Sequence, residues 1–443
     1  MTRSALLAPL VAACLAPAAA GANPVDLFGF GARAPAMGGA QTAATDDGGA
    51  NYYNPAALAR PEEIRIDLGY QLAQPWLSIN GGGQDVDQSR GLVAALSAPG
   101  KLGGLRLALG AAVVLPDERI ARVRTLPAGR PRWSSYDNRP QRIFLASNLA
   151  VRIGRRVAVG GGIAYMSRTE GTVDLAGRVG FPNYEDSDLT LGIDVDLATV
   201  RYPQAGILVN AAPWLDVGLT YRHRFVAEFD QAFRIDGDIG PEGVAPIVDD
   251  GYFFLHSISA DLFQPAQLAL GFSARLTARL LVAGDVVWAR WSAFENPAAH
   301  IELELDLKQF QDLVKIPPNP ALPGVFFHDT LAPRLGFEYT AAARRHVVWR
   351  LRGGYAWEPT PTPEQSGETN FVDNDKHTFS LGLGIEVARV TDLLPRPFDI
   401  DLYAAGTFLP ERTHHKFSPV DPVGDFRARG FVLATGLMTR WHF

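Results

Sequence analysis

Two groups of side chains in the sequence have the types needed for hydrolytic or metal chemistry. Ser257 and Ser259 follow His256 closely, and His414 is followed directly by His415. A nucleophilic serine needs a base within hydrogen-bond reach, and neighbouring residues of an extended chain point to opposite faces. Neither group matches a catalytic motif or the spacing of a metal site, so the sequence predicts no enzyme, no metal and no cofactor.

The only cysteine lies in an amino-terminal segment that has the layout of a secretory signal. Arg3 precedes the apolar run Ala5–Leu15, and small residues follow. We expect residues 1–20 to be removed on export, with cleavage after Ala22 as the alternative. Residues around Cys14 also resemble a lipoprotein box, but the apolar run before it would be very short. If Cys14 is removed with the signal, the mature chain holds no cysteine, which excludes disulfides and thiolate metal sites.

Composition favours strands over helices. The chain holds 44 glycines and 32 prolines, and 10% of its residues are aromatic. After the signal there is no run of about 18 uncharged apolar residues, so no membrane helix is predicted. A membrane strand needs only about ten residues of alternating character. The net charge of −6 argues against a general affinity for nucleic acid.

Alternation of apolar and polar residues predicts about fourteen strands. It is clearest where Ile64, Ile66 and Leu68 share one face while Arg65 and Asp67 share the other. After this first strand, which begins near Glu63, the candidates are Gly91–Ala98, Leu105–Leu115, Gln141–Ile153, Val157–Arg168, Val200–Ala211, Val217–Phe229, Ala266–Leu276, Arg279–Trp291, Thr330–Tyr339, Val347–Trp357, His377–Val387, Phe398–Phe408 and Arg429–Phe443.

Short and long connections alternate along the chain. Several linkers, such as Gly154–Arg156, are short, whereas Pro116–Pro140, Glu170–Thr199 and Asp230–Pro265 are long. Short periplasmic turns opposite longer external loops, with an even strand number, are typical of outer-membrane barrels. We therefore expect an all-β transmembrane antiparallel barrel over residues 61–443, in the outer membrane of a Gram-negative bacterium.

The final strand ends on Phe443, and its apolar residues share one face with Trp441 while Arg440 lies on the other. Charge is costly at lipid depth, so the aromatic face should point outward. This ending resembles the signal that barrel-insertion machinery reads. Aromatic residues near strand ends are expected to form girdles in the headgroup zone; ordinary core aromatics are the alternative. They are Tyr70, Trp76, Trp214, Tyr221, Trp288, Trp291, Trp357, Tyr403 and Trp441.

Residues 21–60 contain no convincing strand but are too apolar for a solvated linker, since they include Phe28, Phe30 and Tyr52. Their motifs, continued in the barrel, resemble the FadL family of outer-membrane hydrocarbon and fatty-acid transporters. The matching residues are Gly31-Ala32-Arg33, Gly38-Gly39-Ala40, Asp46-Asp47 and Tyr53-Asn54-Pro55-Ala56, then Asp285–Ser292, Arg334–Tyr339, Arg352–Ala356 and Asp375-Lys376-His377.

The resemblance implies a fourteen-stranded barrel plugged by an amino-terminal hatch, formed here by residues 21–60, that admits hydrophobic molecules passively. Asn54, Pro55 and Ala56 match the hatch motif of the family. In proteins of that family, a kink in the third strand opens the barrel wall sideways. Gly110 is the corresponding weak point in this sequence, because a glycine within a strand often marks a bend; a glycine that merely fits the wall is the alternative.

We expect the hydrophobic solute to be captured by aromatic and aliphatic residues of the hatch and the long loops, although such loop residues also pack on one another. The candidates are Phe28, Phe30, Phe181, Tyr184, Phe253, Phe254, Leu255, Leu262 and Phe263. Other expected partners are outer-membrane lipid, lipopolysaccharide and the insertion machinery, and the protein is expected to be a monomer. A general aqueous porin, and an adhesin or enzyme on a barrel scaffold, are the rival interpretations.

Overall fold

A computed structural model describes residues 24–84, 86–117, 130–133, 135–136, 142–180, 185, 187–240, 245–297, 300–306, 308, 323–344, 346–388, 396–419 and 421–443. The expected signal over residues 1–20, and the loop residues Phe181 and Tyr184, lie outside the described residues. No helix in the described part is long and apolar enough to cross a membrane.

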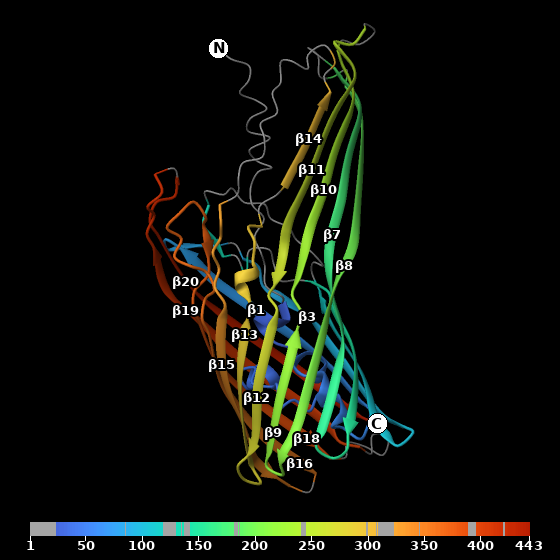
Figure 1. The fold of residues 1–443 in the computed structure, drawn as a ribbon, viewed down its shortest axis with the longest axis vertical. Coiled ribbons are helices and arrows are strands. Elements are labelled where there is room, and N and C mark those ends of the chain that lie inside the picture. The colour runs from blue at the N-terminus through green and yellow to red at the C-terminus, as the bar shows by residue number, and fades with distance from the viewer. Residues whose placement is uncertain are drawn as a thin grey trace.

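Fourteen antiparallel strands close into a barrel (Figure 1). Closure is made by the first and last strands, which pair from Arg65–His442 to Ile79–Ala428, and the strand number agrees with the prediction. In wall order the strands are β1 (Arg65–Ile79), β3 (Ser89–Leu102), β4 (Leu105–Pro116), β6 (Phe144–Ile153), β7 (Val157–Gly180), β8 (Asp188–Ala212), β9 (Leu215–Arg222), β12 (Gln267–Arg275), β13 (Leu280–Ala289), β15 (Thr330–Ala343), β16 (Val347–Glu358), β18 (Lys376–Val387), β19 (Phe398–His414) and β20 (Phe426–His442).

Apolar side chains cover the outside of the wall and small or polar side chains line its inside. In β20, Leu433 and Leu437 are exposed, whereas Arg440 is buried and pairs with Asp67 and Asp399 at 2.7 and 3.2 Å. This distribution of side chains, apolar outside and polar inside, is the reverse of that in a soluble protein. It suits a barrel whose outer surface contacts the hydrocarbon core of a membrane. The faces expected for the last strand are therefore the observed ones.

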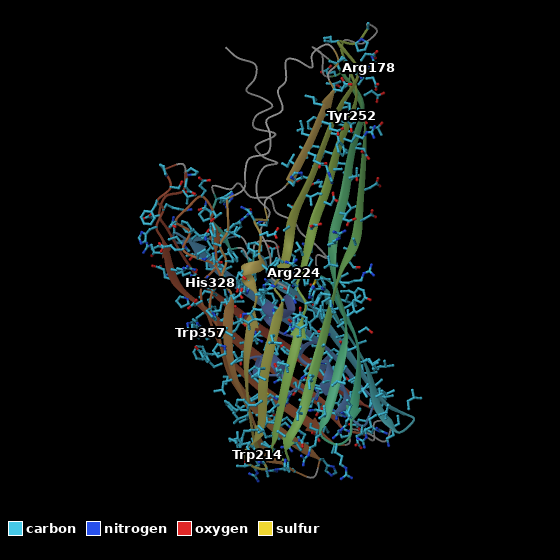
Figure 2. All side chains as sticks on the ribbon, in the orientation of Figure 1. Arg178, Trp214, Arg224, Tyr252, His328 and Trp357 are labelled. Carbon is cyan, nitrogen blue, oxygen red and sulfur yellow. The ribbon has the colours of Figure 1, made fainter. Side chains whose placement is uncertain are left out.

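Aromatic residues gather at both ends of the outer surface. Trp76 stacks on Phe431 with ring centroids 5.8 Å apart, and Trp441 packs on Phe398 at 4.5 Å. Trp214 and Trp357 lie toward opposite ends of the barrel wall in Figure 2. Two residues that we assigned to these girdles lie elsewhere: Tyr403 faces the lumen and is buried, and Trp291 packs among aromatic residues at the barrel mouth.

The chain before β1 lies inside the barrel as short helical turns and loops. They are α2 (Pro24–Phe28), α3 (Arg33–Ala36), α4 (Ala50–Tyr53) and the 3₁₀ helix η2 (Pro55–Ala59). Most of their residues are buried, because the wall surrounds them. Helices this short are stabilised by tertiary packing and not by intrinsic propensity.

The sheet of the wall continues above the barrel as an extension, where we expected loops. The strand order of the extension is β8–β7–β10–β11–β14, with β10 (Phe225–Gly240), β11 (Val248–Gln264) and β14 (His300–Asp306) added to the upper halves of β7 and β8. Figure 1 shows this extension sheet, and Figure 2 places Arg178 and Tyr252 high on it. The segments 170–199 and 230–265 are thus largely strands, and the single strand expected over 217–229 is divided at His223 and Arg224.

Four minor elements complete the fold. The 3₁₀ turn η4 (Trp291–Ala293) follows β13, and the two-residue strand β2 (Gly82–Gly83) pairs with β1. A separate parallel pair joins β5 (Arg132–Trp133) to β17 (Phe371–Val372).

Candidate functional site

The inner segment, which we call the hatch (described residues 24–60), packs directly on luminal glycines. A Cβ on Gly160 would lie 2.5 Å from the Ala56 nitrogen, and one on Gly354 would lie 2.1 Å from the Gly38 nitrogen. Because real Cβ atoms do not approach other atoms so closely, only glycine permits this contact. Further luminal glycines that touch hatch residues are Gly110, Gly206, Gly218, Gly271, Gly336 and Gly382.

The hatch motif joins three parts of the structure. The Asn54 side chain accepts a hydrogen bond from the Ala56 nitrogen at 3.1 Å, which caps η2, and donates to the carbonyl oxygens of Thr42 and Ile207 at 2.7 and 3.1 Å. Pro55 occupies the first turn of η2, where its missing donor is not needed. The motif therefore holds the helix start, the preceding hatch loop and strand β8 together.

A carboxylate on β13 anchors the other side of the hatch. Asp285 Oδ2 accepts hydrogen bonds from the Gln41 nitrogen, the Thr42 nitrogen and Thr42 Oγ1, each at 2.8 Å. Arg33 adds an ion pair to Glu338 at 3.0 Å. These buried contacts come from separate wall strands, so they fix the hatch in one position.

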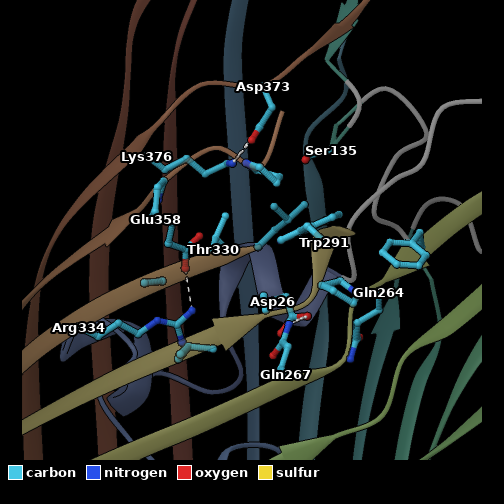
Figure 3. A pocket seen from close by; sticks show the side chains of 18 residues that line it. Asp26, Ser135, Gln264, Gln267, Trp291, Thr330, Arg334, Glu358, Asp373 and Lys376 are labelled. Carbon is cyan, nitrogen blue, oxygen red and sulfur yellow. Dashed lines mark hydrogen bonds and ion pairs between the residues drawn. The ribbon is translucent and has the colours of Figure 1, made fainter. Parts of the chain in front are cut away.

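A narrow cleft with a free volume of about 80 Å³ lies between α2 and the luminal faces of β12, β13, β15, β16 and β18 (Figure 3). Its lining mixes apolar and charged side chains. The residues are Asp26, Leu27, Ser135, Phe263, Gln264, Pro265, Gln267, Val287, Ala289, Trp291, Thr330, Ala332, Arg334, Glu358, Pro359, Pro361, Asp373 and Lys376.

Both cations of the cleft are already engaged by carboxylates. Arg334 donates to Glu358 at 2.7 Å, and Lys376 donates to Asp373 at 2.8 Å (Figure 3). Asp26 likewise accepts hydrogen bonds from Arg222 at 3.0 Å and from Gln267 at 2.9 Å. The cleft presents paired charges, and an incoming anion would have to compete with a protein carboxylate for either cation.

Aromatic rings from distant segments form a roof beside this cleft. Phe294 packs on Phe327 with centroids 4.6 Å apart and on Phe263 at 5.2 Å, while Trp291 lies 5.8 Å from Phe263. Phe371 packs against the same group. Of this aromatic roof, only Phe263 was predicted as a ligand-contacting residue. The others come from segments without a recognisable motif and meet only in the folded chain.

The family model described as outer membrane protein transport protein (OMPP1/FadL/TodX) matches residues 10–393 of the chain. The chain belongs to this family. It is therefore a transport protein of the Gram-negative outer membrane, with a barrel and hatch of the FadL type. No curated protein sequence matches the chain significantly.

Solved structures of FadL-type proteins share the fold at low sequence identity. A FadL homologue of Pseudomonas aeruginosa is 15% identical, with a TM-score of 0.58, and the match covers 97% of this chain and all of that one. The toluene transporter TodX of P. putida is 14% identical with a TM-score of 0.54, over 94% of this chain and 99% of its own. The toluene transporter TbuX of Ralstonia pickettii is 17% identical with a TM-score of 0.51, and the match covers 94% of this chain and all of that one.

The residues predicted to contact ligand in this FadL-type protein fall into separate places. Phe28 and Phe30 are buried hatch residues, and Leu262 packs in the same luminal cluster. Three others lie on the extension sheet: Phe253 and Leu255 share one face, whereas Phe254 lies on the opposite face between Tyr252 and His256. The structure does not bring the described members of this set together into one pocket.

Gly110 lies in a regular part of β4. Its strand pairs with β3 and with β6 without a register shift, and a Cβ at Gly110 would lie 2.2 Å from Asn51 Oδ1 and 2.5 Å from a Leu58 methyl group. Close contact with the hatch thus accounts for the glycine. Lateral opening at this point stays a prediction.

The two histidine groups lack the geometry of a catalytic or metal site. His256 faces Asp230 at 2.7 Å and Glu302 at 3.5 Å, and the hydrogen bond to Asp230 raises the pKa of the imidazole. Ser257 and Ser259 lie on the opposite face of β11. His414 stacks on Phe426, whereas His415 contacts Asp425. Within the described ranges, no group of His, Cys, Asp and Glu could hold a metal ion.

Proposed function

We propose that the protein carries apolar molecules, hydrocarbons or long-chain fatty acids, passively inward across the outer membrane. In this proposal residues 1–20 are the export signal, residues 21–60 form the hatch and residues 61–443 form the barrel. The observation that carries it is a lumen filled by a hatch beneath an aromatic roof. TodX and TbuX are toluene transporters by description, and the shared fold supports cargo of the same class.

Transfer begins on apolar surface outside the membrane. A solute that leaves water gains about 25 cal/mol for each Å² of apolar area that becomes buried. Phe253 and Leu255 of the extension sheet, then Phe263 of the aromatic roof, offer such surface on the way to the cleft. The hatch must then rearrange, because its backbone touches the wall at Gly160 and Gly354.

Other expected partners follow from the outer surface of the barrel. Its exposed apolar band contacts membrane lipid and lipopolysaccharide, and Trp441 and Phe443 at the chain end are proposed to be read by the insertion machinery. We propose a monomer, since the barrel closes on itself and has no free edge at membrane depth.

A transport assay separates this function from that of a porin. Cells that express the protein, in a host without its own fatty-acid uptake, are expected to accumulate radiolabelled toluene or oleate faster than cells without it. Purified protein in planar bilayers is expected to conduct ions poorly, because the hatch fills the lumen. Large, stable conductance without uptake of either probe would instead identify an aqueous porin.

Among apolar cargo, the paired charges of the cleft favour uncharged hydrocarbons. Binding a carboxylate to Arg334 would leave Glu358 without its partner, and an unpaired, partly buried charge is unfavourable. We therefore expect wild-type protein to transport toluene in preference to oleate.

Glu358→Gln is expected to shift that preference toward oleate. The substitution keeps the shape of the side chain but removes the negative charge opposite Arg334. A cargo carboxylate could then form the charged hydrogen bond to Arg334, which contributes about 1.5 kcal/mol, so the oleate-to-toluene uptake ratio should rise about tenfold. Glu386→Gln is the matched control, because Glu386 pairs with Arg350 in a separate charged cavity that holds neither Arg334 nor Glu358. An unchanged ratio in Glu358→Gln would contradict the proposed role of this ion pair.

A further inference from the structure

The order of strands changes between the barrel wall and the extension sheet. In the wall, β8 lies between β7 and β9, and its pairing with β9 ends at Gln204 and Arg222. In the extension, β7 lies between β8 and β10, and the β7–β10 pairing begins at Glu170 and Asp230. The chain after β9 therefore crosses from the side of β8 to the side of β7, near Arg224 (Figure 2).

This crossing leaves a seam in the wall. In the described chain, residues 199–203 of β8 pair with β7, and residues 225–229 of β10 pair with β11, but no strand pairing joins the two segments. The two wall junctions beside it, β7–β8 and β8–β9, are joined by ladders of backbone hydrogen bonds. We call the interval between residues 199–203 and 225–229 the β8–β10 seam.

One apolar face passes around the seam from the outside of the barrel to its lumen. The β7–β8 ladder has no register shift, so Val173 of the extension lies on the same face as Ile163, which is exposed on the outer wall. Val173 is opposite Phe233 of β10. Along β10, Phe233 shares a face with Phe225 and Ala227, which are buried with the hatch residues in the luminal cluster.

The same face is apolar across the upper part of the extension sheet. Residues in direct register lie side by side on one face of a sheet, and the row that includes Val173 and Phe233 continues through every strand. Its members are Leu189, Leu191, Ile193, Val195 and Leu197 of β8, Leu175 of β7, Ile235 of β10, Phe253 and Leu255 of β11, and Ile301, Leu303 and Leu305 of β14. Nearer the seam the same face also carries Gln231 of β10 and Ser257 and Ser259 of β11, so an apolar solute passes these polar groups before it reaches the seam.

One backbone hydrogen bond, from the His223 nitrogen to the Pro203 carbonyl oxygen at 3.0 Å, marks the lower end of the seam, and aromatic side chains meet above it. Tyr202 of β8 and Phe225 of β10 stack with ring centroids 4.8 Å apart and planes inclined by 23°, and both are buried. Rotation of these two rings separates no β-ladder. At Gly110, in contrast, β4 is paired on both sides, so an opening there would have to separate a ladder.

We propose that apolar solutes pass between the extension sheet and the barrel lumen through the β8–β10 seam, with Tyr202 and Phe225 as its gate. This inference rests on the proposed transport of apolar molecules. It names the opening, here called the doorway, through which the solute enters the lumen. The seam begins directly above Tyr221, one of the exposed aromatic residues of the outer wall. The doorway therefore lies where the wall meets the extension, and solute reaches it sideways along the apolar face.

Reversible cross-linking of the seam tests this proposal. Tyr202→Cys and Phe225→Cys are combined with Cys14→Ser, and the pair is bridged in whole cells by a short bis-thiosulfonate that reducing agent removes. The bridge is expected to abolish radiolabelled toluene uptake, and reduction is expected to restore it. The matched control is Ile207→Cys with Leu219→Cys, an outward-facing pair in direct register where β8 and β9 are laddered; its bridge should leave uptake unchanged.

Each outcome of the experiment has one meaning. Uptake by the wild type reports the transport function itself, so its absence would contradict the function, whereas the bridged variants test the doorway alone. Unchanged uptake with the seam bridge verified by mass spectrometry, or equal loss in the control, would overturn the doorway. Tyr202→Leu gives a second measurement: without the stacked ring uptake should become faster, and slower or equal uptake in the correctly folded barrel would contradict the gate.

Discussion

Replacing Asp285 by alanine is expected to turn a poorly conducting barrel into one that conducts ions readily. The carboxylate accepts three hydrogen bonds from Gln41 and Thr42. Each buried donor left without a partner costs about 1–3 kcal/mol, so the hatch should leave its closed position far more often. Single-channel recording in planar bilayers measures the change, which should appear as frequent openings that the wild type lacks.

Glu304→Ala is the control for this experiment, because it removes an exposed carboxylate from the extension sheet and leaves the hatch untouched. Its conductance should equal that of the wild type. If Asp285→Ala assembles normally and still conducts as little as the wild type, the hatch is not held by this anchor. Faster toluene uptake together with higher conductance would indicate that one hatch movement admits both ions and solute.

Gly160→Val is expected to force the hatch off the wall by steric contact. A Cβ at this position would lie 2.5 Å from backbone atoms of Pro55 and Ala56, and backbone atoms of η2 cannot move independently of the hatch. Inserting extra carbon atoms into a packed interior typically costs about 1–3 kcal/mol. The hatch should therefore become sensitive to protease, and the temperature at which the barrel unfolds should fall.

Gly192→Val is the matched glycine substitution, because the nearest atoms to its Cβ are 3.8 Å away. It should change neither protease sensitivity nor unfolding temperature. Both variants are compared by their heat-dependent mobility in gels, which reports the folded barrel, and by mass spectrometry of the cleaved hatch. Equal protection of the hatch in Gly160→Val and wild type would contradict direct packing of η2 on β7.

Sequence reasoning predicted the wall well because each wall strand separates two unlike environments. Leu433 and Leu437 face outward while Arg440 faces the lumen, and that contrast is visible as period-two alternation. The hatch was located by its apolar residues and by the Asn54-Pro55-Ala56 motif. Its helices are too short to show helical periodicity, so only the folded structure could reveal them.

The extension sheet was mistaken for loops even though its sequence alternates. Leu189, Leu191 and Ile193 alternate with Thr190 and Gly192, which is a strand pattern, but we interpreted length alone as a sign of external loops. The aromatic roof could not be predicted, since Phe294, Phe327 and Phe371 belong to separate segments brought together by folding. The seam depends on strand order, which no local pattern specifies.

Both edges of the extension sheet are acidic, and this bears on how neighbouring copies meet in a crowded membrane. The edge strand β8 carries Asp188, Asp194 and Asp196, and the opposite edge strand β14 carries Glu302, Glu304 and Asp306. Unpaired edge strands invite backbone pairing with another chain. Here any edge-to-edge approach, of like or unlike edges, brings negative rows together, so electrostatic self-repulsion keeps tall, partly apolar sheets from joining into intermolecular aggregates.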